Sequence, residues 1–168
     1  SAGDDDDASP CDSGPDVAAP ADELILAMDL PAAAVSAVDT LAAMPTMFAV
    51  REGLGTICPQ VGDSFALLST GNVENIEDYV DFDYPGTGPT PAAGDLATLQ
   101  FAVEVPTGAS ALHFWFYFLS REYPGWVGSN FVDTFEGSVD GVAFSGQIVF
   151  DEFGNPIDVN TPWLVVGP

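Results

Sequence analysis

Residues 97–119 read ATLQFAVEVPTGASALHFWFYFL, and this stretch decides the fold class. Its first part predicts a strand over 97–105, and the residues from Pro106 to Gly108 predict a turn. The remainder predicts the strongest strand of the chain, over 111–119, where almost every residue is apolar or aromatic. A strand of that composition indicates burial on both faces, so the stretch predicts a β-rich core.

Short apolar runs separated by turn residues continue on both sides of this stretch. They predict further strands over 47–51, 64–70, 131–139, 142–150 and 163–166. Many short strands with turn residues between them favour antiparallel pairing. The predicted fold class is therefore mainly β, an antiparallel β-sandwich or jelly roll with a small N-terminal helical segment.

The helical segment is predicted over residues 21–44. Asp22 and Glu23 open a first turn that suits the helix dipole, and Pro31 ends the apolar run that follows them. The Ala-rich residues 32–44 predict a second short helix. Both helices would lie N-terminal to the strands.

The chain is predicted to hold two parts, an acidic leader over 1–20 and a single β-sandwich domain over 21–168. An Asp-rich leader is ordered only where something holds it, so we expect contacts or bound metal there. The first residues lack a basic region followed by an apolar one, which predicts a mature form after signal removal. The sequence contains no run of 18 or more apolar residues, so insertion into a membrane is not expected.

The charge balance is extreme. The chain carries 26 Asp and Glu against 2 Lys and Arg, a formal net charge of −24 over 168 residues. Because 47% of the residues are hydrophobic, a folded domain is predicted rather than an acidic tail. Without a basic surface, neither nucleic-acid binding nor attraction to an anionic membrane is expected. Self-repulsion of this size opposes folding, so we expect positive charge from outside the chain to offset it: a divalent metal, concentrated salt or a basic partner.

Catalytic residue types are scarce. The absence of lysine excludes Schiff-base and P-loop chemistry, and a single histidine, His113, excludes a multi-histidine zinc site. We expect His113 to be a hydrogen-bonded core residue of the apolar strand, and Arg121 to be a structural partner of a nearby carboxylate. Nothing singles out a pair of carboxylates for glycoside hydrolysis. The chain is therefore predicted not to be an enzyme.

Cys11 and Cys58 are the only cysteines, and their spacing fits no metal motif. In a secreted chain an even pair indicates a disulfide, with buried free thiols as the alternative. Such a bridge would close a loop of about 48 residues and contribute roughly 4 kcal/mol by the chain-entropy model. It would also hold the acidic leader to the body of the domain.

Four blocks of sequence resemble a known family. They are FALLSTG at 65–71, ATLQFAVEVPTGASAL at 97–112, FYFLSREYPGWVGSNFVDTF at 116–135 and FSGQIVFDEFGNPIDVN at 144–160. Together they resemble the choice-of-anchor L domain of secreted and surface-attached bacterial proteins. The resemblance implies an extracellular or cell-surface domain with no known catalytic activity. The chain departs from the family at Val132, where Asn is usual, and at Gly125, where Glu is common.

Calcium is the metal that fits this inventory, because it is a hard cation that takes six to eight oxygen ligands. No stretch matches an EF-hand loop. The alternative for each candidate is a solvated carboxylate or an Asn or Asp that caps its own turn. The predicted metal ligands form three groups: Asp81 and Asp83; Glu122, Asn130 and Asp133; and Asp151, Asn155 and Asp158.

These observations predict an exported, calcium-binding β-sandwich subunit that assembles with copies of itself into an extracellular filament or surface layer. Cations that bridge acidic faces of neighbouring copies would turn repulsion into attraction. The alternative is a calcium-dependent adhesin or carbohydrate-binding module, in which Tyr123, Trp126 and Trp163 stack on sugars. Halophilic adaptation is a third explanation, since it accounts for the acidity without specific metal sites.

Overall fold

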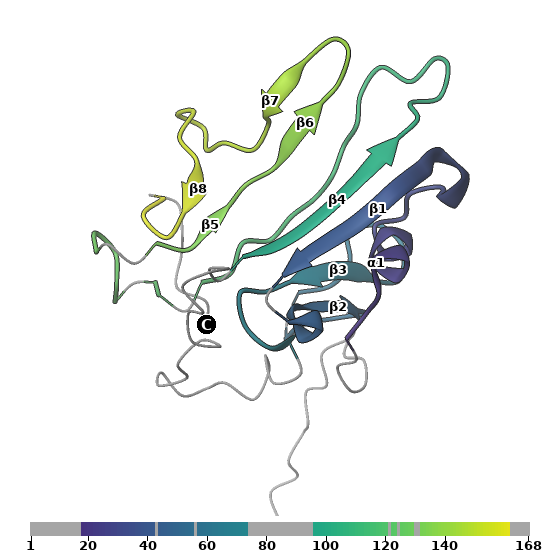
Figure 1. Cartoon of the computed structure of the whole chain (residues 1–168). Coiled ribbons are helices and arrows are strands. Elements are labelled where there is room, and N and C mark those ends of the chain that lie inside the picture. The colour runs from purple at the N-terminus through teal and green to yellow at the C-terminus, as the bar shows by residue number, and fades with distance from the viewer. Residues whose placement is uncertain are drawn as a thin grey trace, which may run out of the picture. The chain divides into compact units, whose positions relative to one another are not determined.

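The computed structural model describes residues 18–42, 44–55, 57–73, 96–120, 122–123, 125–129 and 132–161. The chain divides into two compact units, Ser1–His113 and Phe114–Pro168. Every sheet in the described ranges is an antiparallel pair of strands (Figure 1). The predicted mainly β, antiparallel class is therefore confirmed, while the sandwich arrangement and the single domain over 21–168 stay predictions.

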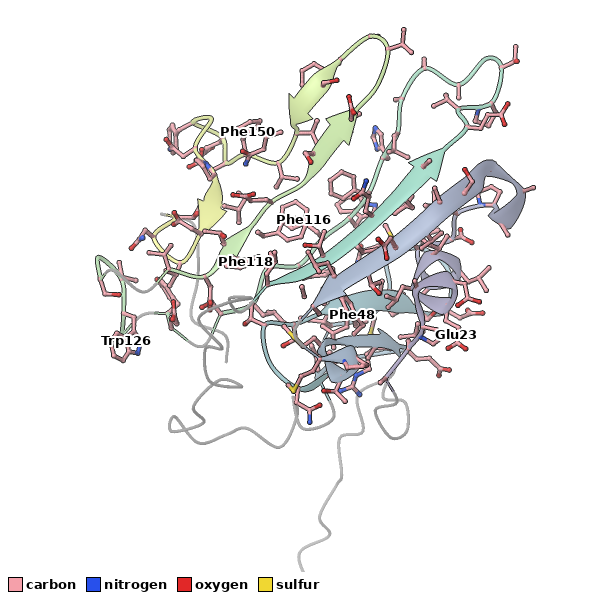
Figure 2. All side chains as sticks on the ribbon, viewed as in Figure 1. Glu23, Phe48, Phe116, Phe118, Trp126 and Phe150 are labelled. Atoms are coloured by element: carbon pink, nitrogen blue, oxygen red, sulfur yellow. The ribbon has the colours of Figure 1, made fainter. Side chains whose placement is uncertain are left out.

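Helix α1 (Ala21–Ala27) of the first unit confirms the predicted N-terminal helix. It buries Leu24 and Ile25, whereas Glu23 lies on its solvent side (Figure 2). Two acidic residues occupy its first turn, where the partial positive charge of the helix N-terminus favours them. The helix ends at Ala27 with Met28 as its C-cap, and Asp29 follows in the left-handed conformation with φ 55°.

The core of the first unit forms where α1 packs on strands β2 (Phe48–Arg51) and β3 (Phe65–Leu68). The two strands pair in register, and both fall within predicted strands. Three buried residues form the centre of the core: Leu24, Met47 and Phe48. Partly buried side chains surround them: Ala19, Ala42, Met44, Val50, Ala66, Ala97 and Leu99.

The longest pair of strands in the described residues is β1 (Val35–Ala42) with β4 (Ala97–Val103). Strand β4 confirms a predicted strand, but β1 shows that the helix predicted over 32–44 is wrong. Only Ala32–Ala34 form a turn of 3-10 helix there. The physical reason is the partner strand, because antiparallel pairing with β4 satisfies backbone groups that a short isolated helix would satisfy weakly. The pairing shifts register near Ala37, whose φ of 50° marks an irregularity in β1.

The described part of the second unit contains four short strands, of which β5 pairs with β8 and β6 pairs with β7. Their bounds are Thr134–Phe135, Ser138–Asp140, Ser145–Gln147 and Ile157–Asp158 for β5, β6, β7 and β8. Gly137 lies between β5 and β6, where an added Cβ would come 2.6 Å from Cγ2 of Val149. Val149 is buried, so the absence of a side chain at 137 lets the backbone there lie close against the side chain of Val149.

The apolar residues 111–119, called here the apolar segment, differ from the prediction. They are not part of any strand in the described structure, and most of their side chains are exposed. The predicted buried strand is therefore wrong, and so is the prediction that His113 is a core residue, since His113 is exposed. An apolar strand is buried only where partner strands or a packed layer cover it. Among the described residues, no strand pairs with residues 111–119. In the described part of the chain, no helix is long and apolar enough to cross a membrane.

Candidate metal centre

Two of the predicted ligands, Glu122 and Asp133, lie together in the second unit. The backbone amide of Asp133 donates to Oε2 of Glu122 over 3.1 Å. The hydroxyl of Ser120 donates to Oδ2 of Asp133 over 2.7 Å and accepts the backbone amide of Glu122 over 3.1 Å. Ser120 thus holds both acidic residues in place, and all three are half-buried.

The pKa of Glu122 is raised above its ordinary value. The main cause is burial, which disfavours the charged carboxylate, and the second is the nearby charge of Asp133. The hydrogen bond from the amide of Asp133 acts in the opposite direction. A carboxyl pair with this balance is stabilised by added positive charge, whether a proton or a metal cation.

The pairing of β5 with β8 brings a third predicted ligand to the same end of the second unit. Asp133 directly precedes β5, and its carbonyl accepts the amide of Val159 over 3.1 Å. Asp158 lies opposite Thr134 in the ladder. The backbones that carry Asp133 and Asp158 are therefore neighbours, although the two residues are far apart in the sequence.

Asp158 and Asn160 shape the loop that closes this end of the unit. Oδ1 of Asp158 accepts the amide of Asn160 over 2.7 Å, and Oγ1 of Thr161 accepts the amide of Asp158 over 2.9 Å. Oδ1 of Asn160 accepts the amide of Gly128 over 2.7 Å. Asn160 thereby ties the turn at 125–128 to the end of β8.

Sequence reasoning missed two of these positioning residues. Ser120 was seen only as part of the block at 116–135, and Asn160 only as the end of the last block. Both act through hydrogen bonds to groups 13 and 32 residues away in the sequence. A local pattern contains no signal for contacts of that kind.

Asp151 and Asn155 form a self-contained turn. Oδ1 of Asp151 accepts the amides of Phe153 and Asn155 over 2.9 and 2.7 Å, and Oδ2 accepts Nδ2 of Asn155 over 3.0 Å. The Asn155 side chain is the main reason that the pKa of Asp151 lies below its ordinary value. This geometry matches the alternative stated above, an Asp that caps its own turn.

The turn that follows Glu122 exposes an aromatic side chain. Trp126 is 52% exposed, and Figure 2 shows it at the outer end of the loop that precedes β5. Its backbone amide donates to the carbonyl of Glu122 over 2.7 Å. Gly128 takes a φ of 80° in this turn, a conformation that favours glycine.

Several predicted residues lie outside the described ranges: Asp81, Asp83, Asn130, Arg121, Trp163 and Cys11. Cys58 is half-buried and disulfide-bonded. Among the described residues, no group of three or more His, Cys, Asp or Glu side chains is arranged to hold a metal ion. The strongest candidate there is thus the pair of Glu122 and Asp133, with Asp158 on the neighbouring strand.

Comparison with protein-family models, curated proteins and solved structures finds no match to this chain. The resemblance to the choice-of-anchor L domain therefore stays a prediction that rests on the four sequence blocks.

Proposed function

We propose that this chain is an exported structural subunit that binds calcium and assembles with copies of itself into an extracellular filament or surface layer. The observation that carries the proposal is the exposure of the apolar segment. In the second unit, Trp115 is 72% exposed, and Tyr117 and Leu119 are each more than half exposed. Contiguous apolar surface of this kind marks an interaction site, because covering it with a partner removes it from water and is favourable.

The net charge explains why assembly would need a cation. A chain of −24 repels its own copies, and salt screens exposed charges only beyond about 8 Å at physiological ionic strength. Carboxylates brought closer than that need a bound cation or a proton. The pair of Glu122 and Asp133 is the described place where added positive charge is most favourable, since the pKa of Glu122 is already raised.

Calcium suits this role better than a softer metal, because the candidate ligands are all oxygen atoms. Two carboxylates and one hydroxyl lie together in the described residues. The rest of a six- to eight-oxygen shell would come from backbone carbonyls, water or a neighbouring copy. A shared ion of that kind links metal binding to assembly.

The test measures particle size with and without calcium. The full chain is followed by light scattering and electron microscopy in millimolar calcium and after chelation, at constant ionic strength. We expect large particles with calcium and folded monomers, verified by circular dichroism, without it. A preparation that stays monomeric at high concentration with calcium present overturns the proposal. If molar KCl has the same effect and calcium adds nothing, halophilic adaptation is the better explanation.

A second candidate function is a calcium-dependent adhesin or carbohydrate-binding module. The observation that favours it is Trp126, whose exposed ring at a loop end suits stacking on a sugar face. Binding of the monomer to immobilised polysaccharides tests it. The expected result is retention that Trp126→Ala abolishes while Trp115→Ala leaves it intact.

A further inference from the structure

We propose that the outer edge of β2, the side that faces away from β3, is a docking edge for the acidic leader of the same chain, with Asp16 placed opposite Arg51. The part of the leader that would dock, residues 12–17, lies outside the described residues. The inference concerns the first unit alone and does not depend on the proposed function. Three observations support it: the pairing of the chain at Ala18, the burial and charge of Arg51, and the disulfide at Cys58.

The described chain begins on this edge. Ala18 forms an antiparallel bridge with Ala49 of β2. The backbone amide of Ala19 donates to the carbonyl of Phe48 over 3.1 Å. The chain that precedes Ala18 therefore arrives at β2 already aligned as an antiparallel neighbour.

The bridge at Ala18 sets the register of the residues before it. In antiparallel pairing, each step back along one strand corresponds to one step forward along the other. Continued from the bridge, this register places Val17 opposite Val50 and Asp16 opposite Arg51, the last residue of β2. The leader thus needs only two further residues in register to cover the rest of the edge.

The backbone of Val50 faces the same edge. The carbonyl of Met47 accepts the amide of Ser69 over 3.0 Å, so the backbone polar groups of Met47 point toward the β3 side. These directions alternate along a strand, so Ala49 also points toward β3 whereas Val50 points to the outer edge. The amide of Val50 is therefore the group that a docked leader would bond.

Arg51 gives this edge a buried positive charge. It is one of only two Lys or Arg residues in the chain and is 3% exposed. A buried guanidinium is favourable only where carboxylates or other acceptors surround it. On the β3 side the residue opposite Arg51 is Phe65, which carries no charge. Because directly opposite side chains lie on the same face of a sheet, Asp16 is the leader residue that the register brings beside Arg51.

The disulfide agrees with this path of the leader. Cys58 is disulfide-bonded, and Cys11 is the only other cysteine of the chain. The backbones of Leu54 and Ile57 bond each other in both directions over 2.9 Å, which folds the chain back and returns Cys58 toward Gly53, just beyond the end of β2. A leader that follows β2 in register leaves the strand at the same end, so Cys11 would meet Cys58 there.

A docked leader closes an edge that would otherwise be open to strands of other chains. The bridge at Ala18 holds one end of the docked part, and the disulfide holds the other. A dithiol such as dithiothreitol breaks the S–S bond to give two thiols and is itself oxidised to a cyclic disulfide. Reduction therefore leaves the pairing of Asp16 with Arg51 as the remaining hold on that end of the leader.

Hydrogen exchange of the full chain, followed by NMR, tests the docking edge. The amide of Val50 reports on the leader, and the amide of Ala49, which faces β3, is the internal control. In the oxidised wild type we expect both amides to be protected. In reduced Asp16→Arg, which loses both holds, we expect protection of Val50 to fall about tenfold or more while that of Ala49 is unchanged. An unprotected Val50 in the wild type, or equal protection in the reduced variant, overturns the proposal.

The register is tested by two matched variants of the oxidised chain. Asp16→Asn should shift the NMR signal of the Nε–H group of Arg51. Asp12→Asn removes the same charge from a leader residue that this register places past the end of β2, and it should leave the signal unchanged. A shift in Asp12→Asn alone, or in neither variant, would show that Asp16 does not lie opposite Arg51.

The mass of the oxidised protein under denaturing conditions shows which chain the leader docks on. We expect the mass of one chain, because the bridge from Cys11 to Cys58 closes within it. A mass of two chains that dithiothreitol converts to one would mean that the leader docks on a second copy, which contradicts the inference.

Discussion

The backbone amide of Asp133 donates a hydrogen bond of 3.1 Å to Oε2 of Glu122. This bond fixes two acidic residues side by side, in a place where burial already disfavours a charged Glu122. The hydrogen bond from this amide offsets only part of the free-energy cost of ionising Glu122, because burial and the charge of Asp133 both disfavour the carboxylate. The arrangement is therefore costly without a cation and becomes favourable with one.

The first prediction concerns Glu122→Gln. Because the pKa of Glu122 is raised on folding, its contribution to stability is fully present below the ordinary value of 4.5 and is lost as the pH rises through the raised pKa. At neutral pH without calcium, the variant should therefore be more stable than the wild type. Solvent screening limits the difference to about 1 kcal/mol or less. The advantage should vanish on acidification, as thermal unfolding across pH will show.

Calcium should reverse that order. Millimolar calcium is expected to raise the melting temperature of the wild type more than that of Glu122→Gln, since the variant lacks one anionic ligand. The control is Glu136→Gln, which removes the same charge from an exposed residue after β5. An equal response of all three proteins to calcium would place the metal site elsewhere.

The second prediction concerns the turn at Asp151. Asn155→Ala removes the main cause of the lowered pKa of Asp151, so that pKa should rise toward the ordinary value of 3.8. In the wild type the lowered pKa adds stability that is present above pH 3.8 and is lost as the pH falls through the lowered value. The difference in stability between wild type and variant should therefore shrink in acid. Carboxyl NMR titration measures the pKa, and an unchanged value would contradict this account.

The sequence predicted the elements whose local pattern and long-range pairing agree. Helix α1 and strands β2, β3 and β4 belong to this class, because each apolar run is bounded by acidic or turn residues. It failed over 32–44, where alanine favours a helix locally but pairing with β4 decides the structure. Pairing with a strand so far along the chain is not visible in a local pattern.

The candidate site was predicted in part. Glu122 and Asp133 were grouped correctly, because they lie 11 residues apart within one block. The neighbouring position of Asp158 was not predicted, since two-residue strands such as β5 and β8 leave no periodic signal. The apolar segment shows the converse failure: its composition indicated burial, but burial depends on a partner that composition does not identify.

The third prediction concerns the disulfide. Cys58 is disulfide-bonded, and its predicted partner is Cys11. Non-reducing peptide mapping should recover the two cysteines in one linked peptide pair. Cys58→Ser should lower the free energy of unfolding by roughly 4 kcal/mol, because the bridge closes a loop of about 48 residues. Two free thiols in the mapping would show that the leader is not held in this way.

The fourth prediction concerns the core of the first unit. Leu24 is fully buried in α1, whereas Leu26, on the same helix, is 60% exposed. Leu24→Ala should cost about 2–5 kcal/mol in urea unfolding, from lost burial and the cavity left behind. Leu26→Ala makes the same chemical change and should cost less than about 0.5 kcal/mol. Equal costs for the two variants would mean that α1 does not pack on β2 and β3 as described.

The fifth prediction concerns the residue that follows α1. Asp29 has a φ of 55°, where a residue with a side chain is strained, and its carboxylate lies near the negative end of the helix. Asp29→Asn removes the charge alone, and Asp29→Gly removes both the charge and the strain. We therefore expect stability to rise from Asp to Asn to Gly, by about 1 kcal/mol in total.

Gly62 provides a check on the local geometry around Asp29. A Cβ added at Gly62 would lie nearest to the side chain of Asp29, at 3.8 and 3.9 Å. Because Gly62 itself has a φ of 70°, Gly62→Ala should destabilise the protein whether residue 29 is Asp or Gly. A gain in stability would show that the turn has been placed wrongly.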